Sequence, residues 1–135
     1  GQALFDGEAS LAAGNQNSGV LLVGTATLQA DFATGTVTGQ MGDFTGFDRT
    51  DEFIEVPGTI TLSGGEIGQG HAANIDADIG GTLSGDGYTI GVTGSVDGSF
   101  RGNPGPVGAL LNSTGETVFI LNGQQVPGGM IIAVQ

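Results

Sequence analysis

The chain is 135 residues long, contains no cysteine and carries a formal net charge of −12 at pH 7, from 14 acidic residues against Arg49 and Arg101. Such a negative field repels phosphate backbones and anionic headgroups, which disfavours nucleic acid and membrane surfaces as partners. Without cysteine the chain has no disulfide, no zinc–thiolate site and no thiol nucleophile. We expect one domain, residues 1–135, because this length suits a single core and no apolar run approaches the ~20 residues of a membrane-spanning helix.

The composition favours an exported protein. Charged residues make up 12% of the chain and apolar residues 38%, a balance that permits a folded core. Lysine is absent, while glycine, threonine, serine and asparagine are abundant, which suits an extracellular or cell-surface location. No basic segment followed by an apolar stretch opens the sequence, so we expect any export signal to have been removed already.

Strict alternation in the first third of the chain predicts a β-hairpin. Residues 25–32 and 36–41 each place apolar side chains on one face and polar side chains on the other, as half-buried strands require. The positions expected to face inward are Ala26, Leu28, Ala30, Phe32, Val37, Gly39 and Met41. The connection at residues 33–35 ends in a glycine that can adopt a positive φ, as a short hairpin turn needs.

Further short strands are expected along the rest of the chain, because 28 glycines leave no window with a helical apolar stripe. They are separated by Gly-, Asn- and Asp-rich turns and lie at residues 4–12, 53–62, 72–79, 88–96, 107–112, 117–122 and 126–135. The sequence therefore predicts an all-β fold, a single small antiparallel β-barrel of about eight strands in an up-and-down meander. We expect residues 130–135 to be the closing strand and apolar side chains of modest size, from alanine to phenylalanine, to fill the interior.

Several glycines fall inside these strands. They weaken local pairing, yet they permit the bends that a small barrel needs at its corners. The glycines expected to act in this way are Gly24, Gly39, Gly91, Gly94 and Gly98.

Few residues are candidates for catalysis or metal binding. His71 is the only histidine, and we expect it in a loop or at a strand edge. The densest acidic segment, "DFTGFDRTDEFIE", is expected to form a solvated loop partly neutralised by Arg49, with calcium binding as the open alternative. Its carboxylates are Asp43, Asp48, Asp51, Glu52 and Glu55. Asp76 and Asp78 share one face of a strand and are expected to face water.

Three segments together resemble the β-barrel domain of transferrin-binding protein B and its relatives among Gram-negative surface lipoproteins. "GTATLQADFATGTVTGQM" (residues 24–41) is similar to the family's Gly-x-Ala-x-Leu-x-x-Asp-Phe hairpin and its Thr-Val-x-Gly return strand. "GSFRGNPGPVGALL" (98–111) is similar to the later Gly-x-Phe-x-Gly segment with its Val-Gly-Gly strand. "VPGGMIIAVQ" (126–135) is similar to the last Gly-Gly-aromatic-x-Ala strand, so the resemblance covers most of the chain.

The resemblance implies that Gly98, Phe100 and Gly102 mark the penultimate hairpin, with Phe100 plugging the barrel. It also implies a Gram-negative setting, at the outer membrane or in the periplasm. The family's ligand contacts lie in variable loops, so no binding residue is identified by the likeness, and no lipidation cysteine is present. The sequence departs from the family pattern at Gly105, Ala109 and Met130.

These observations predict a non-catalytic exported or cell-surface barrel that binds a protein or a small ligand through its loops, the role that the resemblance implies. No Gly-x-Ser-x-Gly elbow is present, and we expect no catalytic residue, cofactor or metal site. The alternative is a structural subunit of an extracellular filament, layer or shell, assembled by strand and loop contacts. In that case the partner is a second copy, paired through the apolar terminal strand.

Overall fold

The computed structural model describes residues 1–68, 74–102 and 105–135, and every regular element in these residues is a β-strand. Six long strands come first: β1 (Gln2–Gly14), β2 (Gly19–Asp31), β3 (Thr36–Asp48), β4 (Phe53–Ile67), β5 (Asn74–Gly85) and β6 (Tyr88–Arg101). Four short segments follow: β7 (Gly108–Ser113), β8 (Val118–Leu121), β9 (Gln124–Val126) and β10 (Gly128–Val134). In the described ranges no helix is long and apolar enough to cross a lipid bilayer.

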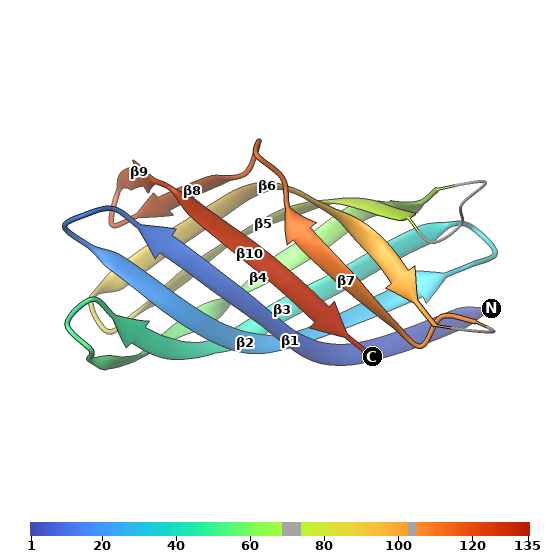
Figure 1. Cartoon of the computed structure of the whole chain (residues 1–135), viewed down its shortest axis with the longest axis horizontal. Helices are drawn as coiled ribbons and strands as arrows, with labels where there is room; N and C mark the ends of the chain where they lie inside the picture. The colour runs from blue at the N-terminus through green and yellow to red at the C-terminus, as the bar shows by residue number, and fades with distance from the viewer. Residues whose placement is uncertain (69–73, 103–104) are drawn as a thin grey trace.

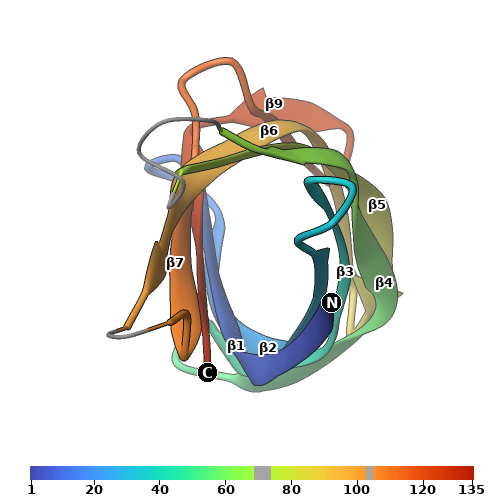
Figure 2. The ribbon, with the colours of Figure 1, turned by 90° about the vertical axis from the view of Figure 1, so that its right-hand side faces the viewer.

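The ten segments make eight barrel strands. Neighbours pair antiparallel in the order β5-β4-β3-β2-β1-β10-β7-β6, and the pairing of β5 with β6 closes the sheet. β7 and β8 pair with successive stretches of β6, residues 96–101 and 90–93, so they form one interrupted strand. β9 and β10 together form its antiparallel partner. The predicted all-β barrel with sequential meander order is confirmed, and β10 is the closing strand (Figure 1, Figure 2).

The predicted hairpin at residues 33–35 is confirmed and is held by Asp31. The Oδ1 atom of Asp31 accepts the backbone N–H groups of Ala33 at 3.0 Å and Thr34 at 3.2 Å. Gly35 follows with a φ of 72°, which glycine adopts without steric cost. One carboxylate and one glycine therefore reverse the chain between β2 and β3.

Four turns meet at one end of the barrel, here called the hairpin end, at residues 15–18, 49–52, 86–87 and 122–123 (left in Figure 1). Hydrogen bonds join neighbouring turns there. The Oδ1 atom of Asn122 accepts the N–H of Thr89 at 2.7 Å, and Asp86 accepts the N–H of Glu55 at 2.7 Å. These bonds link the turns at residues 86–87 and 122–123 to each other and to the start of β4.

The barrel interior is apolar. Its largest fully buried side chains include Phe44, Met41 and leucines or isoleucines from six of the strands, and no described buried side chain is polar or charged. This filling agrees with the expected core of modest apolar residues. Because no buried side chain is polar or charged, the buried part of the described interior offers no side-chain hydrogen bond to a polar ligand.

Phe100 is buried near the end opposite to the hairpin end, one residue before β6 ends at Arg101. It is 6% exposed, and its ring centroid lies 5.7 Å from that of Phe5 and 5.3 Å from that of Phe32. Phe32 was expected to be the last inward residue of its strand, but it is 40% exposed because β2 ends at Asp31. It lies in the turn and covers Phe100 from outside.

Candidate binding surface

The residues singled out for chemistry remain apart. In the part of the chain that the structure describes, no group of three or more histidine, aspartate or glutamate side chains is arranged to hold a metal ion. Asp76 and Asp78 lie exposed on the outer face of β5, as expected. His71 lies outside the described residues.

Asp48 holds the β3–β4 turn. Its Oδ1 atom accepts the hydroxyl of Thr50 at 2.6 Å and the backbone N–H groups of Thr50 at 2.8 Å and Glu52 at 3.1 Å. Its Oδ2 atom accepts the hydroxyl of Tyr88 at 2.7 Å. The bonds from Thr50 and then Tyr88 lower the pKa of Asp48 to about 2, and the same carboxylate raises the pKa of Tyr88. Asp48 therefore has a structural role.

The acidic segment at residues 43–55 is not the loop that we expected. Its first part completes β3 and its last part begins β4, and only residues 49–52 form the turn. Asp43 has a φ of 54° at a bulge between β3 and β4, which breaks the alternation of the sequence pattern. The five carboxylates are thus distributed over two strands and a turn: Asp43, Asp48, Asp51, Glu52 and Glu55.

A row of apolar residues crosses the outer wall beside this turn. Its members are direct cross-strand neighbours, one from each of five adjacent strands: Gly129, Ala12, Leu21, Phe47 and Phe53. This set is called the apolar row. The two phenylalanine rings meet edge to face with centroids 5.8 Å apart. The three large side chains are each more than half exposed, at 62% for Leu21, 53% for Phe47 and 57% for Phe53.

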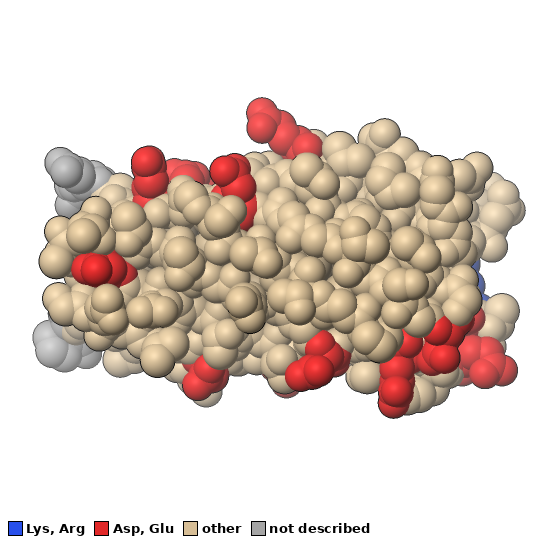
Figure 3. Space-filling model, turned by 180° about the vertical axis from the view of Figure 1, so that it is seen from behind, with Lys and Arg blue, Asp and Glu red and all other residues tan. Residues whose placement is uncertain are grey.

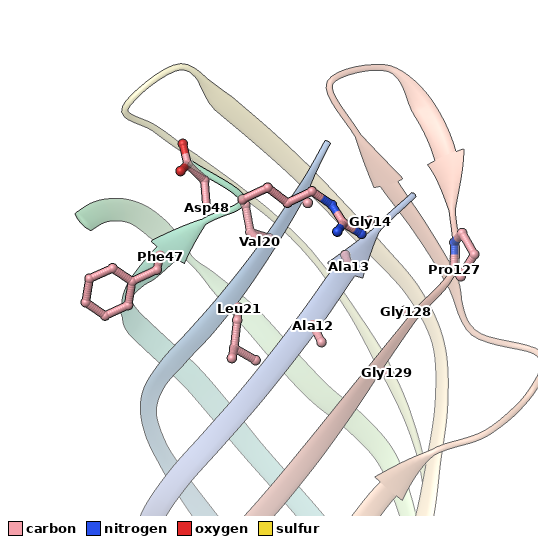
Figure 4. A pocket seen from close by; sticks show the side chains of 12 residues that line it. Ala12, Ala13, Gly14, Val20, Leu21, Phe47, Asp48, Pro127, Gly128 and Gly129 are labelled. Atoms are coloured by element: carbon pink, nitrogen blue, oxygen red, sulfur yellow. The ribbon is translucent and has the colours of Figure 1, made fainter. Parts of the chain in front are cut away.

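The apolar row borders a hollow in the wall, here called the outer groove. It consists of two adjoining depressions, of about 400 and 500 Å³, that share Ala12, Leu21, Gly128 and Gly129. Figure 4 shows the small residues of β1 and β10 forming its floor, with Leu21 and Phe47 projecting on one side. On the other side lie Ile131 and the turn at residues 114–115.

Local sequence explains why the floor is low. Gly129 faces outward on β10, and a Cβ built there would meet no atom within 4 Å, so the space above it is open. Ala12 beside it contributes only a methyl group. The hollow is therefore a consequence of two small residues at neighbouring positions of the sheet.

Arg49 bounds the outer groove at the hairpin end. Its side chain reaches back from the β3–β4 turn over Gly19, where an added Cβ would lie 2.9 Å from Nε. Glycine at this position of β2 thus leaves room for the guanidinium. Arg49 and Asp48 both line the groove, which gives this edge one positive and one negative group.

Acidic side chains concentrate next to the Phe47 and Phe53 end of the row. Asp48 directly follows Phe47, Glu55 lies two residues after Phe53, and the turn between the strands contains Asp51 and Glu52. Figure 3, which views the barrel from behind, shows acidic side chains crowded at its lower right, at the hairpin end. One half of the groove is therefore apolar and the other half adjoins negative charge.

This surface was not predicted from the sequence. The expected strands spanned residues 25–32 and 36–41, whereas β2 starts at Gly19 and β3 runs to Asp48. The run "GVLLV" indicates the longer strand, because Val20 and Leu22 continue the pattern of inward-facing residues in β2. Extending that alternation places Leu21 and Val23 on the outer face.

Comparison with known proteins gives no match: no family model, no curated protein and no solved structure of significant similarity is found.

Proposed function

We propose that this chain is a non-catalytic, exported or cell-surface barrel that binds a protein or small-ligand partner at its hairpin end. The observation that carries the proposal is the outer groove, an exposed apolar hollow bordered by turns on an otherwise closed barrel. Large apolar side chains exposed together are uncommon on monomeric proteins unless they meet a partner. The apolar interior supports the same assignment, because its buried side chains offer no hydrogen bond that would orient a polar ligand inside the barrel.

The likeness to transferrin-binding protein B barrels supports a surface location as a second argument. Phe100 packs between Phe5 and Phe32 at the barrel end, and a Cβ on Gly98 would collide with the carbonyl oxygen of Leu110. Both contacts agree with the roles that the resemblance implies for Phe100 and Gly98, and they support the proposal to that extent. These are barrel-building features, so they favour the architecture of that family and leave the partner to be identified.

The alternative is a structural subunit of a filament, layer or shell, in which the outer groove meets a second copy. Strand addition at the terminal strand has little support, because β10 pairs with β1 on one side and with β7 on the other. The net charge of −12 also opposes close contact between copies. We therefore rank the binding barrel first.

Light scattering on the purified chain over a hundredfold concentration range, with and without a chelator, tests the proposal. A monomer whose mass is independent of concentration is the expected result. A regular assembly would replace the binding barrel by the structural subunit, and its dissociation by chelator would identify a cation as the link. Protease shaving of intact source cells, read with an antibody against the chain, tests the surface location.

A further inference from the structure

The dimensions of the apolar row suit an extended polypeptide. Five neighbouring strands spaced about 4.8 Å apart give the row a length of about 19 Å. An extended segment rises about 3.3 Å per residue, so about six residues cover the row. Side chains of such a segment alternate, and three of the six would face the barrel.

The charged residues around the row indicate which side chains a bound segment should carry. A second copy brings the same carboxylates to the contact, and a nucleic acid or anionic lipid brings further negative charge. A segment with lysine or arginine beside its apolar residues is complementary to Asp51, Glu52 and Glu55, which together outnumber the one cation at this edge, Arg49. Its cations would also lie near the exposed rings of Phe47 and Phe53, whose faces attract positive charge.

The two halves of the groove would bind different kinds of side chain. Over Ala12, Gly128 and Gly129 the floor is low and uncharged, which accommodates aliphatic side chains. Over Phe47 and Phe53 the wall is aromatic and adjoins the acidic turn. A bound segment would therefore place its aliphatic side chains at the Gly129 end of the row and its basic side chains at the Phe53 end.

We propose that the outer groove binds an extended segment of a partner protein, about six residues long, with aliphatic side chains over Ala12 and Gly129 and lysine or arginine over Phe47 and Phe53. This inference rests on the proposed binding function and names the class of partner. It places the contact on the outer wall of β10, β1, β2, β3 and β4.

Three hexapeptides, titrated into isotope-labelled protein and followed by amide chemical shifts, test the proposal. The basic–apolar probe is Leu-Thr-Leu-Thr-Lys-Arg, the acidic probe has glutamate at both basic positions, and the polar probe has serine at both leucines. The expected result is saturable binding of the first probe, at least about tenfold tighter than the other two, with shifts centred on Ala12, Leu21 and Gly129.

Two variants remove the groove in opposite ways. Gly129→Val fills the floor without a clash, since no atom lies within 4 Å of the added Cβ, and Leu21→Ser combined with Phe47→Ser removes the walls. Each is expected to weaken the basic–apolar probe at least about tenfold. The matched controls are Gly91→Val, another outward strand glycine with only ordinary contact at 3.7 Å, and Leu4→Ser, which is 72% exposed and lies outside the row. Neither control is expected to change binding.

The outcomes separate this inference from the proposed function. Equal affinity for the acidic probe, unchanged binding to Gly129→Val, shifts centred elsewhere, or no saturable binding by any probe would overturn the occupant proposed here. A monomeric surface protein with any of these results would still be a binding barrel, using another surface. A regular assembly in light scattering would instead remove the proposed function itself.

Discussion

Asp48 and Tyr88 show how one side-chain pair joins parts of the barrel that are forty residues apart. The carboxylate closes the β3–β4 turn with one oxygen and binds the first residue of β6 with the other. The ionised form accepts all four of these hydrogen bonds, so folding favours ionisation and lowers the pKa of Asp48 to about 2. The turn that carries Arg49 toward the outer groove therefore depends on the charge of one residue.

Asp48→Asn is expected to destabilise the protein at pH 7 and to matter less in acid. The folded-state pKa lies below the ordinary value of 3.8, so the stabilisation is present above about pH 4 and is lost as the pH falls toward 2. Urea unfolding of both proteins at pH 7 and at pH 2.5 measures the change, with pH values chosen on either side of the ordinary pKa. An equal difference in midpoint at both pH values would contradict this role.

Tyr88 provides a direct optical test, because it is the only tyrosine and the chain has no tryptophan. The hydrogen bond to Asp48 raises the pKa of Tyr88, so its stabilising contribution is complete below the ordinary value of 10.0 and is lost as the pH rises through the folded-state value. Ultraviolet titration of tyrosinate should give a higher midpoint for the folded protein than for the chain in urea. In Asp48→Asn the folded midpoint should move back toward that of the unfolded chain.

Phe100→Ala is expected to destabilise the barrel by about 3–5 kcal/mol, the usual range for a buried phenylalanine. The ring is 6% exposed and contacts both Phe5 and Phe32, so its loss opens the end opposite to the hairpin end. Equilibrium unfolding in urea gives the magnitude. Val107→Ala, at a residue of the same connection that is 65% exposed, is the matched control and should change stability little.

At the scale of elements, the interruption between β7 and β8 is stabilised by hydroxyl groups. The Oγ1 atom of Thr117 donates to the carbonyl oxygen of Ser95 at 3.0 Å and accepts its N–H at 3.3 Å. Ser95 and Thr114 share a further hydroxyl contact at 2.7 Å. Gly94 makes this possible, because a Cβ there would collide with the backbone of Thr117.

Thr117→Val and Gly94→Ala are expected to destabilise the same break for different reasons. Valine keeps the shape of threonine but removes both hydrogen bonds, at about 1–2 kcal/mol. Alanine at Gly94 forces the threonine backbone away, which should cost at least as much. Urea unfolding and hydrogen exchange of β8 measure both effects. Gly91→Ala, on the same strand with its nearest contact at 3.7 Å, should leave stability nearly unchanged.

The elements that the sequence predicted well are those with an uninterrupted period of two. The hairpin of β2 and β3 agrees at every alternating position from Ala26 to Ala30, and β10 closes the barrel as expected. The outer groove could not be predicted in the same way, because it depends on register. Leu21, Phe47 and Phe53 become neighbours only once three strands are aligned, and the bulge at Asp43 hides the end of β3.

The five strand glycines that the sequence analysis named differ in how closely the neighbouring strand approaches them. An added Cβ would contact backbone or a core side chain at Gly24, Gly39, Gly94 and Gly98, whereas Gly91 has room. The space beside each glycine depends on which face of the sheet its missing side chain would occupy and on which residue lies next to it. A single sequence does not contain that information, because the approach of the next strand depends on twist and bulges.

At the scale of the whole molecule, the net charge of −12 acts against the compact state as well as against self-association. The register places some of this charge in direct opposition. Asp76 on β5 lies opposite Glu66 on β4 and Asp97 on β6, and all three side chains are exposed on the outer wall. Directly opposed like charges on neighbouring strands are destabilising.

Asp76→Asn is therefore expected to stabilise the barrel, by about 0.5 kcal/mol at low ionic strength, because it removes the central member of this line of carboxylates. The gain should shrink as salt is added, since exposed charges are screened. Urea unfolding at low and high salt measures both effects. Glu116→Gln is the matched control, because it removes the same charge from an exposed turn position that has no strand partner. An equal gain in the free energy of unfolding for both variants would mean that net charge alone governs the effect. A larger, salt-sensitive gain for Asp76→Asn identifies the cross-strand repulsion as the cause.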